Sequence, residues 1–212
     1  MLDTFKLFKL ERWPDPPPAI PDTVRHLELM ACPGLRSLRD ISHLTRLRVL
    51  RLGVCADLAH VSLRPFAHLE ELSLVDVGVR ALDDLNRAPR LHTAYFRDLP
   101  ALATITADGE EQQVLRQLSL GECPALHTID GLAHLTGLER VAFEDLPRLT
   151  SVRALMGLRK LRELAIIGCP GIVGIAPLVR LPALARVTIS RCPGIRDLEL
   201  WGARADVEVT VT

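Results

Sequence analysis

The stretch that decides the fold covers residues 115–138 and reads LRQLSLGECPALHTIDGLAHLTGL. Its apolar residues first follow an L-x-x-L-x-L spacing at Leu115, Leu118 and Leu120, and the alternation over the last two leucines is typical of a short strand. From Cys123 to Leu138 an apolar residue then recurs at every third position, which is typical of a loosely helical return. Such a unit cannot bury its own apolar side, so it requires copies of itself stacked on both sides.

Copies of this unit follow one another along nearly the whole chain of 212 residues. Each copy carries a strand-type pair of apolar residues separated by one residue, and neighbouring pairs lie 22 to 24 residues apart. This regular step predicts a single α/β solenoid shaped like a horseshoe arc, with a parallel sheet on the concave face and short helical or irregular returns on the convex side. The nine pairs are Phe5/Leu7, Leu27/Leu29, Leu50/Leu52, Leu72/Leu74, Ala94/Phe96, Leu118/Leu120, Val141/Phe143, Leu164/Ile166 and Val187/Ile189.

The two ends of the chain depart from the repeat. Residues 1–21 have strand-type positions followed by a return with five prolines, which exclude a helix there. We expect this segment to be a degenerate N-terminal cap that covers the first core layer with Trp13 and Ile20; a disordered linker is the alternative. The repeat array is expected over 22–200. Residues 201–212 are predicted to form a C-terminal edge strand, because their valines alternate with polar residues.

Composition excludes several classes of protein. Lysine and arginine total 26 and so do aspartate and glutamate, so the global positive charge of a typical nucleic-acid binder is missing and any charged recognition must be local. The first residues lack the features of a secretory signal, and no apolar run approaches the roughly 18 residues of a membrane span. We therefore expect a soluble, cytoplasmic protein. Arginine greatly outnumbers lysine, which indicates a GC-rich bacterial coding sequence.

The cysteines share one repeat position, three residues after the second strand residue. Val77, Leu99 and Leu146 take this position in other copies, so we interpret the thiols as small buried hydrophobes. Close C-x-x-C pairs are missing, and a metal site is not expected. The sequence also has no phosphate-cradling loop, nucleophile elbow or paired-carboxylate site, so we expect neither catalysis nor a cofactor. The five cysteines at this repeat position are Cys32, Cys55, Cys123, Cys169 and Cys192.

Acidic residues gather at one edge of the predicted concave face. The position just before the turn is acidic in four consecutive copies, and at about 4.8 Å per strand these carboxylates would run some 14 Å. Tyr95, the only tyrosine, is expected mid-array on the same face, where an amphipathic ring suits an interface anchor. We hypothesise a protein-binding site for a basic segment, against the alternative of a solvated edge that serves solubility. The site residues would be Asp76, Tyr95, Arg97, Asp98, Glu122, Glu144 and Asp145.

A second candidate surface is the return at residues 104–115. It is one residue longer than its neighbours and carries Asp108, Glu110 and Glu111. We expect this segment to bulge outward as an acidic loop around 106–113. Such a loop either contributes to binding or is a solvent-exposed loop with no role in binding.

The pattern L-x-x-L-x-L-x-x-C-P-x-L resembles the cysteine-containing leucine-rich repeats, and most of all the sensor arrays of NLR-type immune receptors, both plant resistance proteins and bacterial NACHT or STAND proteins. The resemblance covers residues 22 to about 200 and is carried by Cys-Pro motifs. It implies a non-enzymatic protein-recognition module that acts as a sensor or adaptor in bacterial defence or signalling. The motifs are Cys32-Pro33-Gly34-Leu35, Cys123-Pro124-Ala125-Leu126, Cys169-Pro170-Gly171-Ile172 and Cys192-Pro193-Gly194-Ile195.

Two other functions stay open on the sequence. The chain shows no nucleotide-binding module, so it could be an excised sensor, a small adaptor or an inhibitor. In the second reading, an immunity protein neutralises a toxin or nuclease and the acidic stripe imitates nucleic-acid charge; overall neutrality weakens the imitation. In the third, the chain is a scaffold that self-assembles through the edge formed by residues 207–212.

Overall fold

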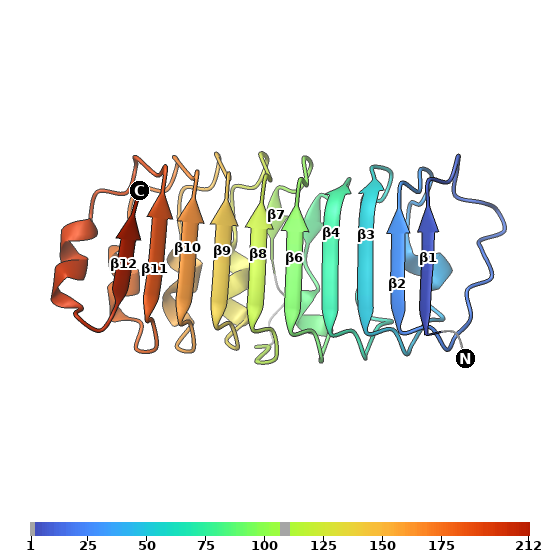
Figure 1. Ribbon diagram of the computed structural model, residues 1–212, viewed down its shortest axis with the longest axis horizontal. Helices are drawn as coiled ribbons and strands as arrows, with labels where there is room; N and C mark the ends of the chain where they lie inside the picture. Colours follow the sequence, from blue (N-terminus) through green and yellow to red (C-terminus); the bar gives the residue numbers. More distant parts are fainter. Residues whose placement is uncertain (1–2, 107–110) are drawn as a thin grey trace.

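A computed structural model describes residues 3–106 and 111–212. Its main element is a 10-stranded parallel sheet in which the strands follow one another in chain order, with only β5 and β7 outside it (Figure 1). The connections all return behind the same face of the sheet, so the open face is lined by strands alone. The strands are β1 Thr4–Phe8, β2 His26–Met30, β3 Val49–Cys55, β4 Glu71–Val77, β6 Thr93–Arg97, β8 Gln117–Gly121, β9 Arg140–Glu144, β10 Glu163–Ile167, β11 Arg186–Ser190 and β12 Glu208–Val211.

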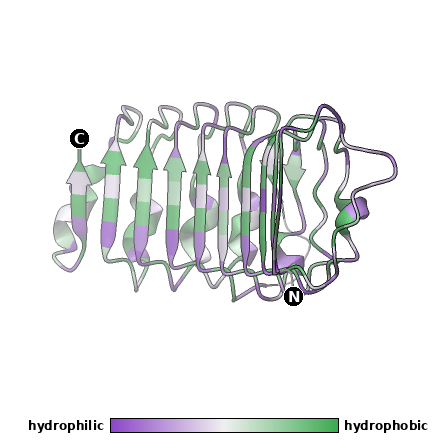
Figure 2. Cartoon of the chain, turned by 45° about the vertical axis from the view of Figure 1, so that its right-hand side comes forward, coloured by the Kyte–Doolittle hydropathy of each residue, from purple (hydrophilic) through white to green (hydrophobic). Residues whose placement is uncertain are grey.

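The register of the sheet confirms the repeat alignment derived from the sequence. Leu27 lies opposite Leu50, which lies opposite Leu72, and the same apolar ladder continues to the last strand, where Val209 lies opposite Val187. Because side chains alternate between the two faces of a strand, each ladder points into the interior and the residues between face the open side. Figure 2 shows this alternation as bands of apolar and polar residues across the strands.

The returns hold only short helices, as expected from apolar residues that recur at every third position. Six 3-10 helices lie on the convex side, and no helix in the described ranges is long and apolar enough to cross a membrane. Parts of two returns are extended and form a small parallel sheet of β5 Ala81–Leu82 and β7 Thr104–Ile105, and the first of these returns also holds a helix. The helices are η1 Leu38–Ile41, η2 Leu85–Arg87, η3 Asp130–His134, η4 Arg153–Gly157, η5 Ala176–Arg180 and η6 Leu198–Ala203.

The core is one continuous stack of aliphatic layers between the sheet and the returns. Phe66, Phe96 and Phe143 are its largest fully buried side chains. All five cysteines are buried, which confirms their interpretation as small core residues. At the N-terminal end Trp13 and Ile20 are buried as well, and the indole Nε1 of Trp13 donates a hydrogen bond to Asp40 at 2.8 Å.

One buried position of the stack is polar, and the sequence did not reveal it. Gln112 takes the place that Leu135 has in the next coil, and it is 5% exposed. Both ends of its side-chain amide are hydrogen-bonded: Nε2 donates to the carbonyl of Ala88 at 3.3 Å, and Oε1 accepts from the backbone N–H of Leu115 at 2.8 Å. Burial of this amide is tolerated because both of its ends are hydrogen-bonded.

Candidate functional site

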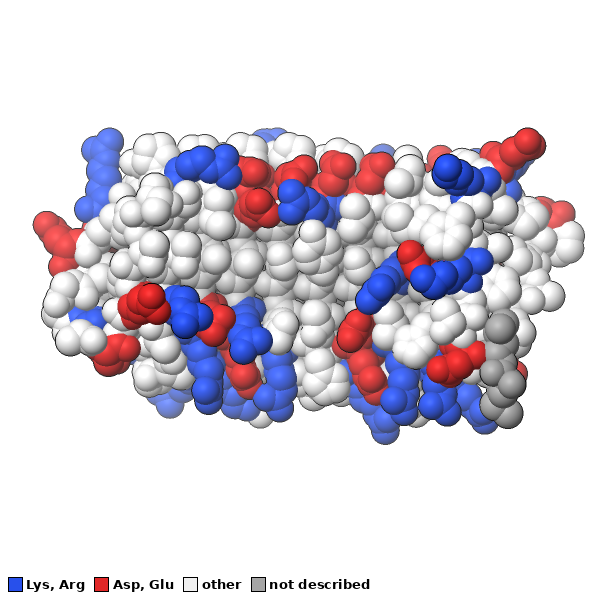
Figure 3. Space-filling model, in the orientation of Figure 1, with Lys and Arg blue, Asp and Glu red and all other residues white. Residues whose placement is uncertain are grey.

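The centre of the concave face is an uncharged floor. Between its first two core residues, each strand of the main sheet from β4 to β11 carries an uncharged residue, and Tyr95 is the one large residue of this row. Figure 3 shows this floor as a white band between two charged rims. The row reads Ser73, Tyr95, Ser119, Ala142, Ala165 and Thr188.

Small side chains on the floor leave a hollow beside the tyrosine. The hollow has a volume of about 340 Å³ and is lined by the first three positions of the strands from β6 to β11. Tyr95 stands at its N-terminal end and is 37% exposed. Ala142 and Ala165 form its floor, where a partner's backbone could approach closely.

Arg97 ties together the upper rim of the concave face, above the hollow and outside its lining residues. Its guanidinium donates to Glu144 Oε2 at 3.0 Å and to Glu122, so one cation joins carboxylates from the next two coils. Gly121 lies between Arg97 and Glu144 in the register, and its missing side chain leaves the path across β8 open. A hydrogen bond with the Tyr95 side chain, followed by the contacts with Glu122 and Glu144, raises the pKa of Arg97, so this cation stays charged at every accessible pH.

The position before the turn has a special backbone conformation. Every residue of this row except one glycine has a φ between 50° and 54°, in the left-handed region. Aspartate tolerates this region better than most residues, which gives Asp76, Asp98 and Asp145 a local reason beyond their charge. The row is not reserved for acids, because the same φ occurs at Lys9, Ala31, Val54 and Arg191.

The structure divides the predicted acidic stripe into paired and unpaired carboxylates. Asp145 is paired with Arg191 at 3.3 Å, across the gap left by Gly168, and Arg97 holds the two glutamates. Asp76 and Asp98 have no ion pair with any residue in the described ranges. Six of the seven predicted residues lie along one rim, where they retain a net negative charge and Arg191 joins them, whereas Tyr95 stands on the neighbouring floor.

The opposite rim of the hollow is a charge ladder that the sequence analysis missed. Glu163 lies between Arg140 at 3.4 Å and Arg186 at 3.4 Å, and Arg186 also reaches Glu208 at 3.2 Å. The sequence contains a signal for this ladder, because these residues occupy the first position of successive strands and their charges alternate in sign. This rim lines the hollow and is locally balanced, so the net negative charge of this half of the concave face comes from the acidic rim above the hollow.

The other half of the concave face is different in character. Lys6 and Glu28 are paired at 2.7 Å in the middle row of β1 and β2, and Arg51 follows them on β3 with Glu71 at 3.8 Å. Paired charges thus replace the neutral floor over the first strands (Figure 3). The hollow and the acidic rim belong to the later coils.

The other candidate surface, the loop at 106–113, is described only in part. Residues 107–110, and with them Asp108 and Glu110, lie outside the described residues. Glu111 is exposed, and the buried Gln112 follows it directly.

Comparisons with known proteins identify the architecture. No protein-family model and no curated protein sequence matches the chain. Among solved structures it is similar to internalin C2 from Listeria monocytogenes, with a TM-score of 0.65, 23% identity and coverage of 84% of this chain and 77% of that chain. It is also similar to the leucine-rich repeat domain of the type III effector XopL, with a TM-score of 0.62, 19% identity and coverage of 98% and 75%. At these identities the likeness shows the fold, which is a leucine-rich-repeat solenoid.

Proposed function

We propose that this chain is a non-enzymatic protein-recognition module whose concave face binds a basic segment of a protein partner. The site would be the hollow and its acidic rim, with the partner's backbone over the neutral floor and its cations along the rim. Support comes from the solenoid architecture, which presents an extended surface made of side chains from every coil. The residues in contact would be Asp76, Tyr95, Arg97, Asp98, Glu122, Glu144 and Asp145.

The observation that carries this proposal is the position of Tyr95. It is a half-exposed aromatic residue beside a hollow, and it shares a face of β6 with Arg97, which is itself held by two carboxylates. Tyrosine and arginine are enriched at the energetic centres of protein interfaces. A preorganised side chain also loses less conformational entropy on binding. The cluster therefore has the chemistry and the rigidity of an interface anchor.

At a finer level, we propose a role as a sensor or adaptor in bacterial defence or signalling. The support is the resemblance of its Cys-Pro repeats to receptor sensor arrays. A test of partner identity tests this role directly, since a sensor should capture a ligand or an effector and an inhibitor should capture a toxin or nuclease.

The experiment is a pull-down from a lysate of the organism that encodes the chain, with captured proteins identified by mass spectrometry. The test variant carries Asp98→Lys, Glu122→Lys and Asp145→Lys. The matched control carries Asp83→Lys, Asp130→Lys and Glu199→Lys, three exposed acids that lie on the returns. Both variants change the net charge equally, so only the location of the change differs.

We expect a basic partner that the wild type and the control retain and the test variant loses. A Tyr95→Ala variant should weaken the same interaction without changing the charge. If the test variant keeps the partner, the acidic rim is not the binding site. Loss in both charge variants would mean that retention depends on net charge alone.

A further inference from the structure

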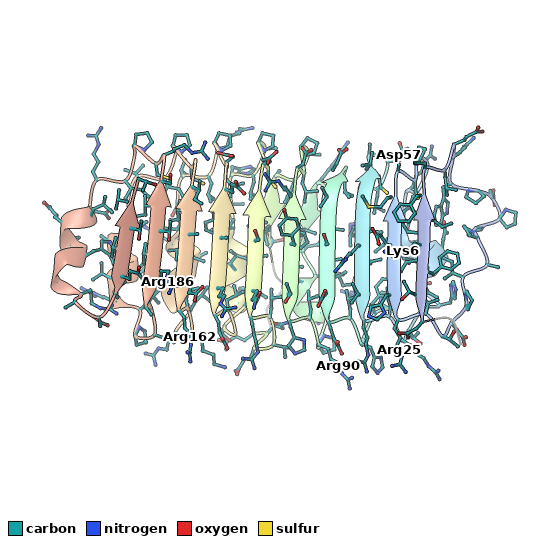
Figure 4. The ribbon with its side chains drawn as sticks, in the orientation of Figure 1. Lys6, Arg25, Asp57, Arg90, Arg162 and Arg186 are labelled. Carbon is teal, nitrogen blue, oxygen red and sulfur yellow. The ribbon has the colours of Figure 1, made fainter. Side chains whose placement is uncertain are left out.

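The edge of the solenoid at which the strands begin is strongly basic. We define this basic edge by the four residues that precede each strand from β3 to β11 of the main sheet. These segments contain seven lysines or arginines and two glutamates, and all seven cations are exposed. Figure 3 shows Lys and Arg side chains projecting along this edge, and Figure 4 labels Arg90 and Arg162 on it. The seven are Arg46, Arg48, Arg90, Arg116, Arg159, Lys160 and Arg162.

Backbone hydrogen bonds stack these segments in a straight line. The amide of Glu70 donates to the carbonyl of Arg48 at 2.7 Å, and the ladder continues to Arg162, whose amide donates to Glu139 at 2.8 Å. Five strand steps separate the coil of Arg46 from the coil of Arg162. At about 4.8 Å per step the cations extend over roughly 24 Å.

The acids on this edge are already neutralised. Glu70 is paired with Arg48 at 3.7 Å, and Glu139 with Arg116 at 2.6 Å. Five exposed cations then have no ion pair within the described part of the chain: Arg46, Arg90, Arg159, Lys160 and Arg162. Although the net charge of the chain is zero, its charges are separated in space: the edge where the strands begin is basic, and the rim where they end is acidic.

We propose that the basic edge binds the phosphate backbone of a nucleic-acid duplex without reading its sequence. A line of unpaired cations gains free energy when a polyanion displaces its counterions. The guanidinium fork matches phosphate oxygens, and four of the five unpaired cations are arginines. A length of roughly 24 Å corresponds to about seven base pairs of duplex.

The residues between the cations favour a duplex over two other polyanions. The seven segments contain no phenylalanine, tyrosine or tryptophan, and their two histidines, His68 and His92, do not form a continuous platform on which single-stranded bases could stack. Their leucines, among them Leu47, Leu91 and Leu161, are completely buried. An anionic membrane usually needs exposed apolar anchors in addition to charge, and this edge has none in its defining segments.

The test is fluorescence anisotropy of a short labelled DNA duplex of arbitrary sequence, titrated with the whole chain at several salt concentrations. The test variant carries Arg90→Gln, Arg159→Gln and Arg162→Gln. The matched control carries Arg36→Gln, Arg148→Gln and Arg196→Gln, which are exposed and follow the turns at the opposite edge. Each variant removes three exposed cations and leaves the same net charge.

We expect the wild type and the control to bind the duplex with an affinity that falls linearly with salt on a double logarithmic scale. The test variant should lose tenfold or more in affinity at low salt, and its salt slope should fall by about three, one for each phosphate contact. The proposal is overturned if the wild type does not bind at low salt or if both variants lose affinity equally. Binding to anionic lipid vesicles or to polyglutamate in place of the duplex would overturn it too.

Discussion

At the scale of the residue, the turn after each strand imposes a left-handed backbone on whatever side chain is present. Nine coils meet this demand, and only Gly168 does so with the residue that adopts the region without cost. Val54 is the least suited, because a β-branched side chain with a φ of 53° is a steric outlier. It is also 50% exposed, so packing contributes little in return.

We therefore predict that Val54→Asn stabilises the protein. Asparagine tolerates the left-handed region, and the expected gain is about 1 kcal/mol in the free energy of unfolding. Urea denaturation followed by circular dichroism measures the change. Gly168→Ala is the opposite control: its Cβ would lie 1.9 Å from Asp145 Oδ1 with a φ of +63°, so it should lose stability. A destabilised Val54→Asn variant would show that the valine side chain contributes packing that outweighs its strain.

At the scale of the element, carboxylates from one coil hold the return of the coil before it. Asp84 accepts hydrogen bonds from the backbone N–H of Leu63 at 2.8 Å and from Ser62 Oγ at 3.1 Å. Asp197 does the same for the start of η5, where it accepts from the amides of Ile175, at 2.8 Å, and Ala176. The returns make few hydrogen bonds of their own, so these backbone donors, including those at the start of η5, depend on the neighbouring coil.

Asp197→Ala should cost about 1 to 2 kcal/mol in the free energy of unfolding, the usual range for loss of a helix-capping carboxylate. Asp197→Asn should cost less, because its amide oxygen can still accept one bond. Asp130→Ala is the matched control, an exposed aspartate at the start of η3. Thermal and urea unfolding of the three variants measure these changes in the free energy of unfolding. Equal losses of stability for Asp197→Ala and Asp130→Ala would contradict a specific role for the hydrogen bonds between coils.

At the scale of the whole molecule, buried thiols recur along the stack and couple stability to alkaline pH. Burial raises the pKa of Cys32, Cys123 and Cys169 from 9.0 to about 11, because a thiolate loses its hydration in the core. The folded chain then keeps protons that the unfolded chain has released. This contribution to stability is complete below about pH 9 and is lost as the pH rises towards 11.

We predict that the free energy of unfolding falls between pH 9 and pH 11, with a shallower fall in a Cys123→Val variant. Valine is a compatible replacement, since Val77 takes the same repeat position and is fully buried. Urea midpoints measured across this pH range for both proteins provide the comparison. Parallel pH curves would mean that Cys123 is not responsible for any of the loss.

Much of the candidate site could be placed from the sequence, and its energetics could not. Position in the repeat put Tyr95 and Arg97 on the concave face and Glu122 at its rim, because strand alternation leaves no other choice. The partners of Arg97 and Asp145 depended on side-chain reach across Gly121 and Gly168, which spacing does not reveal. The capping carboxylates were missed for a related reason: they do not share one repeat position, so they leave no periodic signal.

The sequence by itself determined the solenoid, its register and its buried thiols, since a period of 22 to 24 residues with fixed apolar positions permits one stacking of strands. Only the tertiary structure decided which charges are paired and which edge of the molecule they occupy. The physical reason is that a repeat fixes the path of the backbone. Electrostatic interactions depend on distances between side-chain tips of different coils, and those distances exist only after the coils are stacked.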